Sequence, residues 1–405
     1  MKVQIAVLMT AVALLVPVAR AHEPAQDSPA IKEVNAAFSA SHNLDHELAL
    51  SHARKAVALD PNSSRVHRGL ASIIWLQQVF ERGTMTVDHF LGSVSTSKLP
   101  QPKVDPKLSE EFKGALAKAI ELAERRLRQE PRNLDALFDA GAAYSIQASH
   151  MASVEGGLGG ALKAARRAFD TQNEVLTRDP SRASAGFVVG MYRYVISTQP
   201  RLVQMFAWLA GFPGDKQKAI EFIEAASHDP LSRVEGKSAL IVIYSREGRH
   251  SEAMRLAGEL SVELPRNRLL LLEEGAAAIR AGRAGDANAV LTRGLAAFET
   301  DTRPKIRSEH ALWLYKRGLA RLNLNRPAEA KIDLDRALTV QPLPWVEGRI
   351  HVALGKLADL AGRRPDAMAA YTTARTKCTE AADKSCLDEA PQYLKQPFSF
   401  DHRRP

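Results

Sequence analysis

Prolines and small residues recur at fixed spacings along much of this chain. The first spacing separates a proline from a glycine in three pairs: Pro131 and Gly141, Pro180 and Gly190, and Pro265 and Gly275. The second separates a glycine from an alanine in three pairs: Gly275 and Ala287, Gly318 and Ala330, and Gly355 and Ala367. Regular spacing of this kind is the sequence signature of a structural unit that is repeated along the chain. The fold is therefore expected to be an array of similar units.

Each unit has the features of two antiparallel helices joined by a short turn. The segments 281–286 and 361–366 contain the glycine or proline that ends one helix and begins the next. A small residue in each helix lets the two helices approach closely, and the proline that follows ends the unit. One hairpin cannot bury its own apolar face, so neighbouring hairpins must stack. The sequence therefore predicts an all-α fold, an α-solenoid of stacked antiparallel helical hairpins.

The small, small, large, small and proline positions of residues 311–342 carry a family resemblance. They are Gly318, Ala330, Leu334, Ala337 and Pro342. This pattern resembles the tetratricopeptide repeat, and the chain looks like an exported bacterial protein of that superfamily. The resemblance implies a right-handed superhelix whose first helices line a concave groove. The family's first-helix tryptophan is absent from the matching units, and the proline spacing departs from the period in the N-terminal half of the chain.

The first 21 residues have the features of a cleaved signal peptide. Lys2 supplies a positive charge, residues 5–18 are almost wholly apolar, and residues 19–21 form a small-x-small cleavage site. The apolar stretch is too short to be a typical membrane-spanning helix. We expect a mature chain that begins at His22, lies in the periplasm or is secreted, and has no transmembrane span.

Two insertions interrupt the period and divide the chain. The predicted organisation is as follows: 1–21 signal peptide, 22–190 degenerate helical hairpins with a loop insertion at 81–110, 191–215 apolar insertion, 216–377 tetratricopeptide array, and 378–405 capping tail. Asp215 is expected to cap the helix that begins at Lys216. Insertions of this kind are where function often lies.

The apolar insertion supplies the candidate partner-binding residues. They are Tyr192, Tyr194, Arg201, Phe206, Trp208 and Phe212. Three interpretations of this segment remain open: its aromatic residues fill the core between two stretches of solenoid, they form a hydrophobic docking site for a partner, or residues 202–213 contact a membrane surface. The segment is too short to span a bilayer.

The net charge of +9 does not indicate nucleic-acid binding. The densest basic cluster, at residues 125–128, is surrounded by Glu121, Glu124 and Glu130. Interleaved charges of this kind are typical of a solvated helix face with pairs of opposite charge. Weak attraction to an anionic envelope surface is the expected consequence of the charge.

Motifs for catalysis, metals and cofactors are not found. His42, Asp45, His46 and His52 cluster in sequence but lack the His-Glu-x-x-His arrangement of metalloproteases. The glycines at 156–160 lack the Gly-Lys-Ser/Thr ending of a phosphate-binding loop. We therefore expect no enzyme activity, no metal and no cofactor, with an envelope enzyme or metal-binding protein near these histidines as an alternative.

The two cysteines predict a disulfide bond. On an unbroken helix Cys378 and Cys386 would lie roughly 12 Å apart along the axis, which is too far to bond. A break near residues 383–385 would let the chain fold back, and export would favour oxidation. Apolar residues of the tail, among them Tyr393 and Phe398, are expected to cover the last hairpin.

These observations together favour a binding protein. The predicted function is an exported scaffold or adaptor that holds a protein or peptide partner in the concave groove, without catalysis. The alternatives are the envelope enzyme or metal-binding protein near the N-terminal histidines, and a membrane-surface adaptor that uses residues 202–213.

Overall fold

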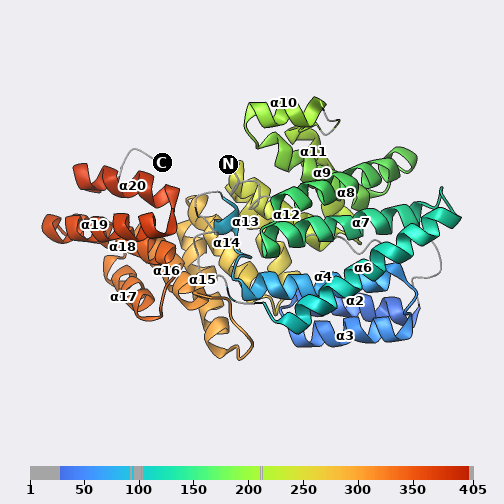
Figure 1. Ribbon diagram of the computed structural model, residues 1–405. Coiled ribbons are helices and arrows are strands. Elements are labelled where there is room, and N and C mark those ends of the chain that lie inside the picture. Colours follow the sequence, from blue (N-terminus) through green and yellow to red (C-terminus); the bar gives the residue numbers. More distant parts are fainter. Residues whose placement is uncertain are drawn as a thin grey trace. The chain divides into compact units, whose positions relative to one another are not determined.

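The computed structural model describes residues 28–91, 94, 102, 104–209, 211 and 213–400. The predicted signal peptide and Phe212 lie outside the described residues. Within the described part Figure 1 shows helices and no strands. The predicted all-α fold of stacked antiparallel helical hairpins is confirmed, since consecutive helices pack against each other as pairs in each of two compact units.

The first unit comprises the described residues of Met1–Phe80, Pro102–Ile243 and Leu264–Asn267. Its helices are α2 (Pro29–His42), α3 (His46–Leu59), α4 (Ser64–Glu81), α6 (Pro106–Gln129), α7 (Leu134–His150), α8 (Leu158–Arg178), α9 (Ala183–Ser197), α10 (Arg201–Leu209), α11 (Lys216–His228) and most of α12 (Arg233–Arg246), with a π-helical turn at Met151–Glu155. Packed pairs within it are α2 with α3, α7 with α8, and α9 with α11.

The second unit comprises the described residues of Glu81–Gln101, Tyr244–Glu263 and Arg268–Pro405. Its helices are α5 (Val87–Phe90), α13 (His250–Glu263), α14 (Arg268–Arg280), α15 (Ala284–Thr300), α16 (Glu309–Asn323), α17 (Pro327–Thr339), α18 (Pro344–Leu360), α19 (Arg364–Ala381) and α20 (Lys384–Lys395). Packed pairs are α14 with α15, α16 with α17, and α18 with α19.

Side-chain caps and prolines fix where the helices begin. The carboxylate of Asp215 accepts a hydrogen bond from the backbone N–H of Lys218 at 3.0 Å, as expected for the N-cap of α11. Asn133 caps α7 in the same way, through the N–H of Ala136 at 2.9 Å. Pro327 and Pro344 occupy the first turns of α17 and α18, where a missing N–H costs nothing.

The periodic glycines lie where helices of one hairpin touch. A Cβ atom at Gly275 would lie 2.4 Å from Cγ of Leu291, one at Gly318 would lie 2.9 Å from Cγ of Leu334, and one at Gly355 would lie 2.4 Å from Cε1 of Tyr371. Equivalent contacts are found at Gly141 with Gln172 and at Gly190 with the carbonyl of Ala219. The periodic alanines Ala287, Ala330 and Ala367 are fully buried. The repeated spacing therefore records the close approach of paired helices.

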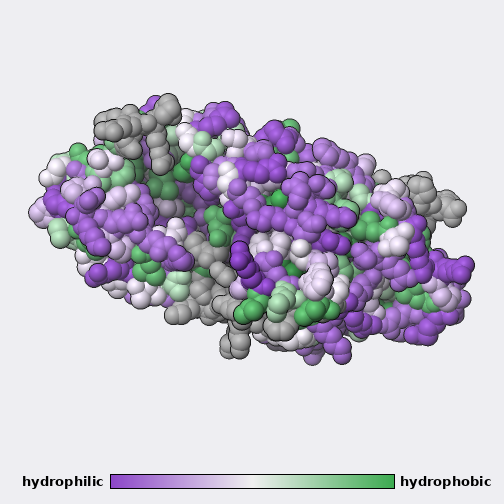
Figure 2. Space-filling model, turned by 90° about the horizontal axis from the view of Figure 1, so that it is seen from above, coloured by the Kyte–Doolittle hydropathy of each residue, from purple (hydrophilic) through white to green (hydrophobic). Residues whose placement is uncertain are grey.

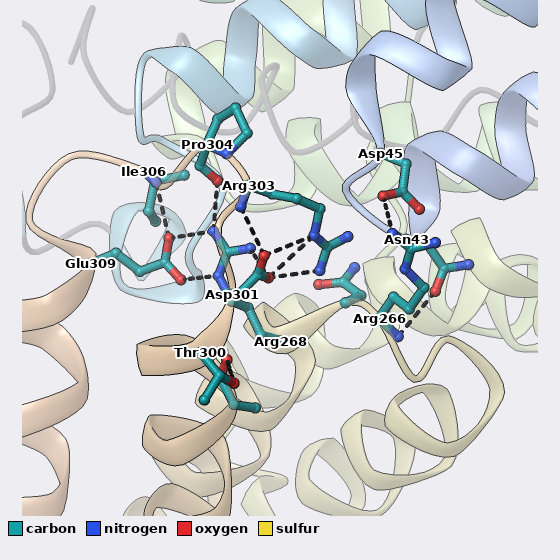
Figure 3. Close-up of polar contacts among 12 residues, drawn as sticks. Asn43, Asp45, Arg266, Arg268, Thr300, Asp301, Arg303, Pro304, Ile306 and Glu309 are labelled. Atoms are coloured by element: carbon teal, nitrogen blue, oxygen red, sulfur yellow. Dashed lines mark hydrogen bonds and ion pairs between the residues drawn. The ribbon is translucent and has the colours of Figure 1, made fainter.

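A buried arginine holds the long loop between α15 and α16. The guanidinium of Arg268 donates to the Glu309 carboxylate at 2.7 and 3.0 Å, to Asp301 at 2.7 Å and to the carbonyl of Pro304 at 2.8 Å (Figure 3). Hydrogen bonds from Arg303, together with the charge of Arg268, hold the pKa of Asp301 below its usual range. These bonds fix the loop on the start of α14.

The tail folds back on the last hairpin at a defined break. Helix α19 ends at Ala381, Ala382 adopts a left-handed conformation, and Asp383 is the N-cap of α20. This reversal brings Cys378 and Cys386 together, with their Cα atoms 6.0 Å apart, and a disulfide bond joins them. Beyond α20, the N–H of Phe398 donates to Asp359 at 2.8 Å. The tail therefore packs on both helices of the last hairpin, with α20 against α19 and Phe398 bonded to Asp359 of α18.

Candidate functional site

The structure separates the candidate partner-binding residues of the apolar insertion. Residues 191–197 belong to α9, and Tyr192 and Tyr194 are only 1% and 2% exposed. Their expected role in contacting a partner is therefore corrected, because both rings pack into the core of the first unit. Arg201 and Trp208 lie on α10 and are exposed, while the side chain of Phe206, like Phe212, falls outside the described part.

Helix α10 leaves large apolar side chains in solvent. Leu202 and Trp208 are 68% and 65% exposed, and Met205 and Leu209 are exposed as well. Over the face drawn in Figure 2, hydrophilic residues predominate and apolar residues form separate smaller areas. Among the described helices, none combines the length and the apolar character needed to cross a membrane. The exposed apolar side chains of α10 form a solvent-accessible apolar surface on this helix.

The N-terminal histidines do not converge on a common point. Nδ1 of His52 lies 2.5 Å from Oε2 of Glu33, and Nε2 of His42 lies 3.4 Å from Oε1 of Glu235. The ring of His46 packs on Phe80, with the ring centroids 4.3 Å apart. The described residues contain no group of three or more histidine, cysteine or acidic side chains that could hold a metal ion.

The first insertion contains the strongest candidate for a binding site. The one-turn helix α5 interrupts the sequence between α4 and α6, yet it belongs to the second unit. Val87, Asp88, His89 and Phe90 are all buried there. We call the residues that hold α5 the α5-binding surface: Arg246, Glu273, Lys316, Trp345 and Arg349. Each lies on the first helix of a hairpin, namely α12, α14, α16 or α18.

Both ends of α5 are recognised through the backbone. The N–H of Val87 donates to Oε1 of Glu273 at 3.0 Å. At the other end, Nη1 of Arg246 donates to the carbonyl of Phe90 at 2.6 Å. The N–H and C=O groups at the ends of a single helical turn lack partners within the helix. Glu273 supplies a partner for the N–H of Val87, and Arg246 supplies one for the carbonyl of Phe90.

The carboxylate of Asp88 is the centre of a buried ion cluster. Nζ of Lys316 lies 2.6 Å from one oxygen of Asp88, and Nη1 of Arg349 lies 3.1 Å from the other. Arg349 also pairs with Asp383 at 2.6 Å. Burial alone would raise the pKa of Asp88, but the charges of Lys316, Arg349 and Arg280 outweigh burial and hold that pKa well below its usual range. Asp88 is therefore ionised at neutral pH.

His89 and Trp345 make the aromatic part of the contact. Their ring centroids lie 5.5 Å apart in an edge-to-face arrangement. Nδ1 of His89 is 2.8 Å from the hydroxyl of Thr86. Burial is the main reason that the pKa of His89 is lowered to about 4. The imidazole is therefore neutral at neutral pH and packs as an aromatic ring.

The sequence predicts a loop insertion at 81–110 and indicates neither α5 nor its partners. A local signal existed in an aspartate placed within the apolar run at residues 87–91, and in Lys316 between the buried residues of α16. Neither position indicates its partner, because the contact joins residues that are far apart in the chain.

Comparisons with known proteins identify similar solved structures but do not indicate an activity. No family model and no curated protein matches the chain. Similar solved structures include a tetratricopeptide repeat protein from Parabacteroides merdae (13% identity, 80% of this chain and 98% of that chain covered, TM-score 0.31). They also include yeast Tom70 (11%, 91% and 89%, 0.38) and the human IFIT1 dimer with m7Gppp-AAAA (16%, 97% and 85%, 0.43). These TM-scores are too low to support a conclusion, so the description of the fold is based on the helix contacts within this chain.

Proposed function

We propose that this protein is an exported scaffold that binds a segment of another protein on the α5-binding surface. One observation carries the proposal: the surface already holds a chain segment by its backbone at both ends and by a buried carboxylate between them. The surface lies on first helices, which the tetratricopeptide resemblance predicts to line the concave groove. The proposed activity is binding without a chemical step.

The contacts with α5 are of the kind that give a peptide site both affinity and selectivity. Backbone contacts supply affinity that does not depend on sequence, and pockets for individual side chains supply selectivity. Here Lys316 and Arg349 select a carboxylate, and Trp345 selects a neighbouring ring. Arginine and tryptophan are also among the residues that contribute most to measured binding energies.

The proposed location outside the cytoplasm rests on two features. Residues 1–21 have the composition of a signal peptide, and the disulfide between Cys378 and Cys386 is a bond that persists in oxidising compartments. We therefore place the binding activity in the periplasm or outside the cell.

Site-specific photo-crosslinking tests the proposal directly. A photoreactive amino acid replaces Arg280, a half-buried residue of α14 that is close enough to influence the pKa of Asp88. The control carries the same amino acid at Ile332, which is 65% exposed on the second helix α17. After irradiation in the native compartment, we expect a discrete crosslinked protein from position 280 and not from position 332. Equal or absent crosslinking at the two positions contradicts the proposal.

A membrane-surface adaptor is a second candidate, favoured by the exposed apolar side chains of α10. A short helix with exposed tryptophan and leucine can lie in the interface of a bilayer. Flotation with vesicles of anionic phospholipid tests this function. If it is correct, the protein floats and the variant with Trp208→Ser and Leu209→Ser does not; failure of both to float excludes it.

A further inference from the structure

We infer that residues 86–91 are an intrachain ligand of the α5-binding surface, and that the external partner is a protein segment with a carboxylate beside an aromatic ring that displaces them. The inference rests on the proposed function and adds two points to it, the chemistry of the partner and the competition that the partner must overcome. Four observations carry it.

The charge of the α5-binding surface requires an acidic occupant. Lys316 has a side chain that is only 5% exposed, and Asp88 accepts its hydrogen bond. Arg349 retains Asp383 as a second partner, whereas Lys316 forms no second ion pair among the described contacts. The carboxyl of the buried Glu273 also interacts with the charge of Lys316, but burial raises the pKa of Glu273 and so disfavours its charged form. A buried ammonium group without a counter-ion is strongly unfavourable. A segment that replaces residues 86–91 must therefore bring its own carboxylate to this position.

The backbone contacts select a segment that forms a helical turn, and they do not select a particular amino-acid sequence. Glu273 accepts from the N–H of Val87, and Arg246 donates to the carbonyl of Phe90. These groups occur in every residue except that proline lacks the N–H. An external segment with the pattern of Asp88 and His89, a carboxylate followed by a ring, could make the same contacts in the same register.

The fit of residues 86–91 leaves polar groups of the surface unsatisfied. Nε1 of Trp345 and Oε2 of Glu273 on this surface are buried and have no hydrogen-bond partner in the part of the chain that the structure describes. The same is true of Nε of Arg280, whose charge acts on Asp88. A buried polar group without a partner lowers stability. An external segment that offered an acceptor to Trp345 or a donor to Glu273 would gain bonds that the chain's own segment does not make.

The segment is an addition to the helical hairpins. It falls between α4 and α6, outside the helices that form the repeated pairs. Its release would leave the contacts of α14 with α15, and of α16 with α17, in place. Because it is tethered, it competes at the high effective concentration of a linked ligand. The apparent affinity for an external segment is reduced by the fraction of molecules in which the surface is occupied.

Peptide binding to the full chain tests the inference. The probe is a fluorescein-labelled peptide with the sequence of residues 84–91, and the control peptide has asparagine at the position of Asp88. The chain is used unchanged, with Asp88→Asn, and with Val87→Pro. Val87→Pro should be tolerated, because proline is accepted at the first position of a helix and Thr86 already has the extended conformation that precedes proline. The substitution removes the N–H that donates to Glu273 and keeps the ion cluster.

The expected result is weak binding to the unchanged chain and binding at least about tenfold tighter to both variants, because each weakens the intrachain ligand. Asp335→Asn, which alters an exposed ion pair of α17, should bind like the unchanged chain. The asparagine peptide should bind none of the chains measurably. Thermal unfolding of each variant identifies loss of fold, and Val87→Pro keeps the test valid if Asp88→Asn is unfolded.

Equal affinity of the folded variants and the unchanged chain overturns the idea of an intrachain ligand. Equal binding of the two peptides overturns the assignment of an acidic partner. Either outcome, combined with specific crosslinking from position 280, leaves the proposed function standing. Absence of crosslinking together with tight peptide binding would instead contradict a protein partner in the cell and leave the intrachain ligand supported.

Discussion

Lys316 donates a hydrogen bond to Asp88 at 2.6 Å inside the second unit, although the two residues are 228 positions apart in the chain. The pair joins an insertion between α4 and α6 to α16, a first helix of the repeat. Both side chains are almost completely buried. A buried ion pair is maintained only with good geometry and further hydrogen bonds, here supplied through Arg349.

The pair should show strong energetic coupling. Lys316→Met leaves the buried carboxylate of Asp88 with Arg349 as its remaining ion-pair partner and should lower the free energy of unfolding by about 3 kcal/mol. Adding Asp88→Asn to Lys316→Met should restore a large part of this loss, because no ion is then left without its partner. Urea unfolding of the two single variants and the double variant measures the coupling. Additive effects would mean that the pair does not form.

Acidification should weaken the second unit through His89. The folded-state pKa of about 4 lies below the usual 6.5, so the unfolded chain binds the extra proton first. Stability therefore falls as the pH is lowered from about 6.5 to about 4, by about 3 kcal/mol for this group. The groups that face the imidazole are Asp88, Lys316, Arg349 and the ring of Trp345.

His89→Phe keeps a ring against Trp345 and should remove this part of the pH dependence. Thermal unfolding is measured for the variant and for the unchanged chain between pH 4 and pH 7. The contributions of the other histidines cancel in the difference between the two unfolding midpoints at each pH. His67→Gln, at a half-buried histidine of α4, is the matched control and should retain the slope. The same slope in His89→Phe and in the unchanged chain would contradict a buried neutral imidazole.

Enlarging a periodic glycine should overpack its hairpin. A Cβ at Gly318 already meets Leu334 at 2.9 Å, so Gly318→Leu should cost about 1–3 kcal/mol. Gly285 lies within α15 and has no atom within 4 Å of an added Cβ, so Gly285→Ala should be neutral or slightly stabilising. Urea midpoints measure both variants, and an unchanged midpoint for Gly318→Leu would show that the hairpin contact is wrong.

Loss of the disulfide should loosen the tail first. Replacing Cys378 and Cys386 with serine should cost roughly 2–3 kcal/mol, the value for closing a loop of this length. Because the bond joins α19 to α20, limited proteolysis should release the tail before the hairpins are cut. Thiol counting on the protein from its native compartment, under denaturing, non-reducing conditions, is the direct control. Two free thiols there would show that the bond is not formed.

Export itself is tested by N-terminal sequencing of the protein from its native compartment. The composition of residues 1–21 predicts a mature chain that starts at His22. A soluble cytoplasmic product that retains Met1 would contradict the proposed location, and would also remove the expected reason for oxidation of the cysteines.

Local features of the fold were predictable because they depend on neighbours in the sequence. Gly318 and Leu334 belong to one hairpin, and the chain reversal at Ala382 lies next to the residues where a break was expected. The role of Tyr192 was not predictable, because an aromatic residue in an apolar helix has the same local pattern in a core as on a docking surface. Asp88 and Lys316 give no local signal of each other, since their contact depends on the assembled repeat.

Amide hydrogen exchange of residues 86–91 in the full chain shows directly whether a bound partner displaces this segment from the α5-binding surface. The exchange is measured for the full chain alone and for the full chain with a saturating amount of the partner protein that photo-crosslinking from position 280 identifies. Displacement predicts faster exchange at Val87 and its neighbours, while amides of α16 and α17 keep their protection. Unchanged or slower exchange at residues 86–91 in the presence of the bound partner would contradict the account, because the partner would then bind without taking the place of the chain's own segment.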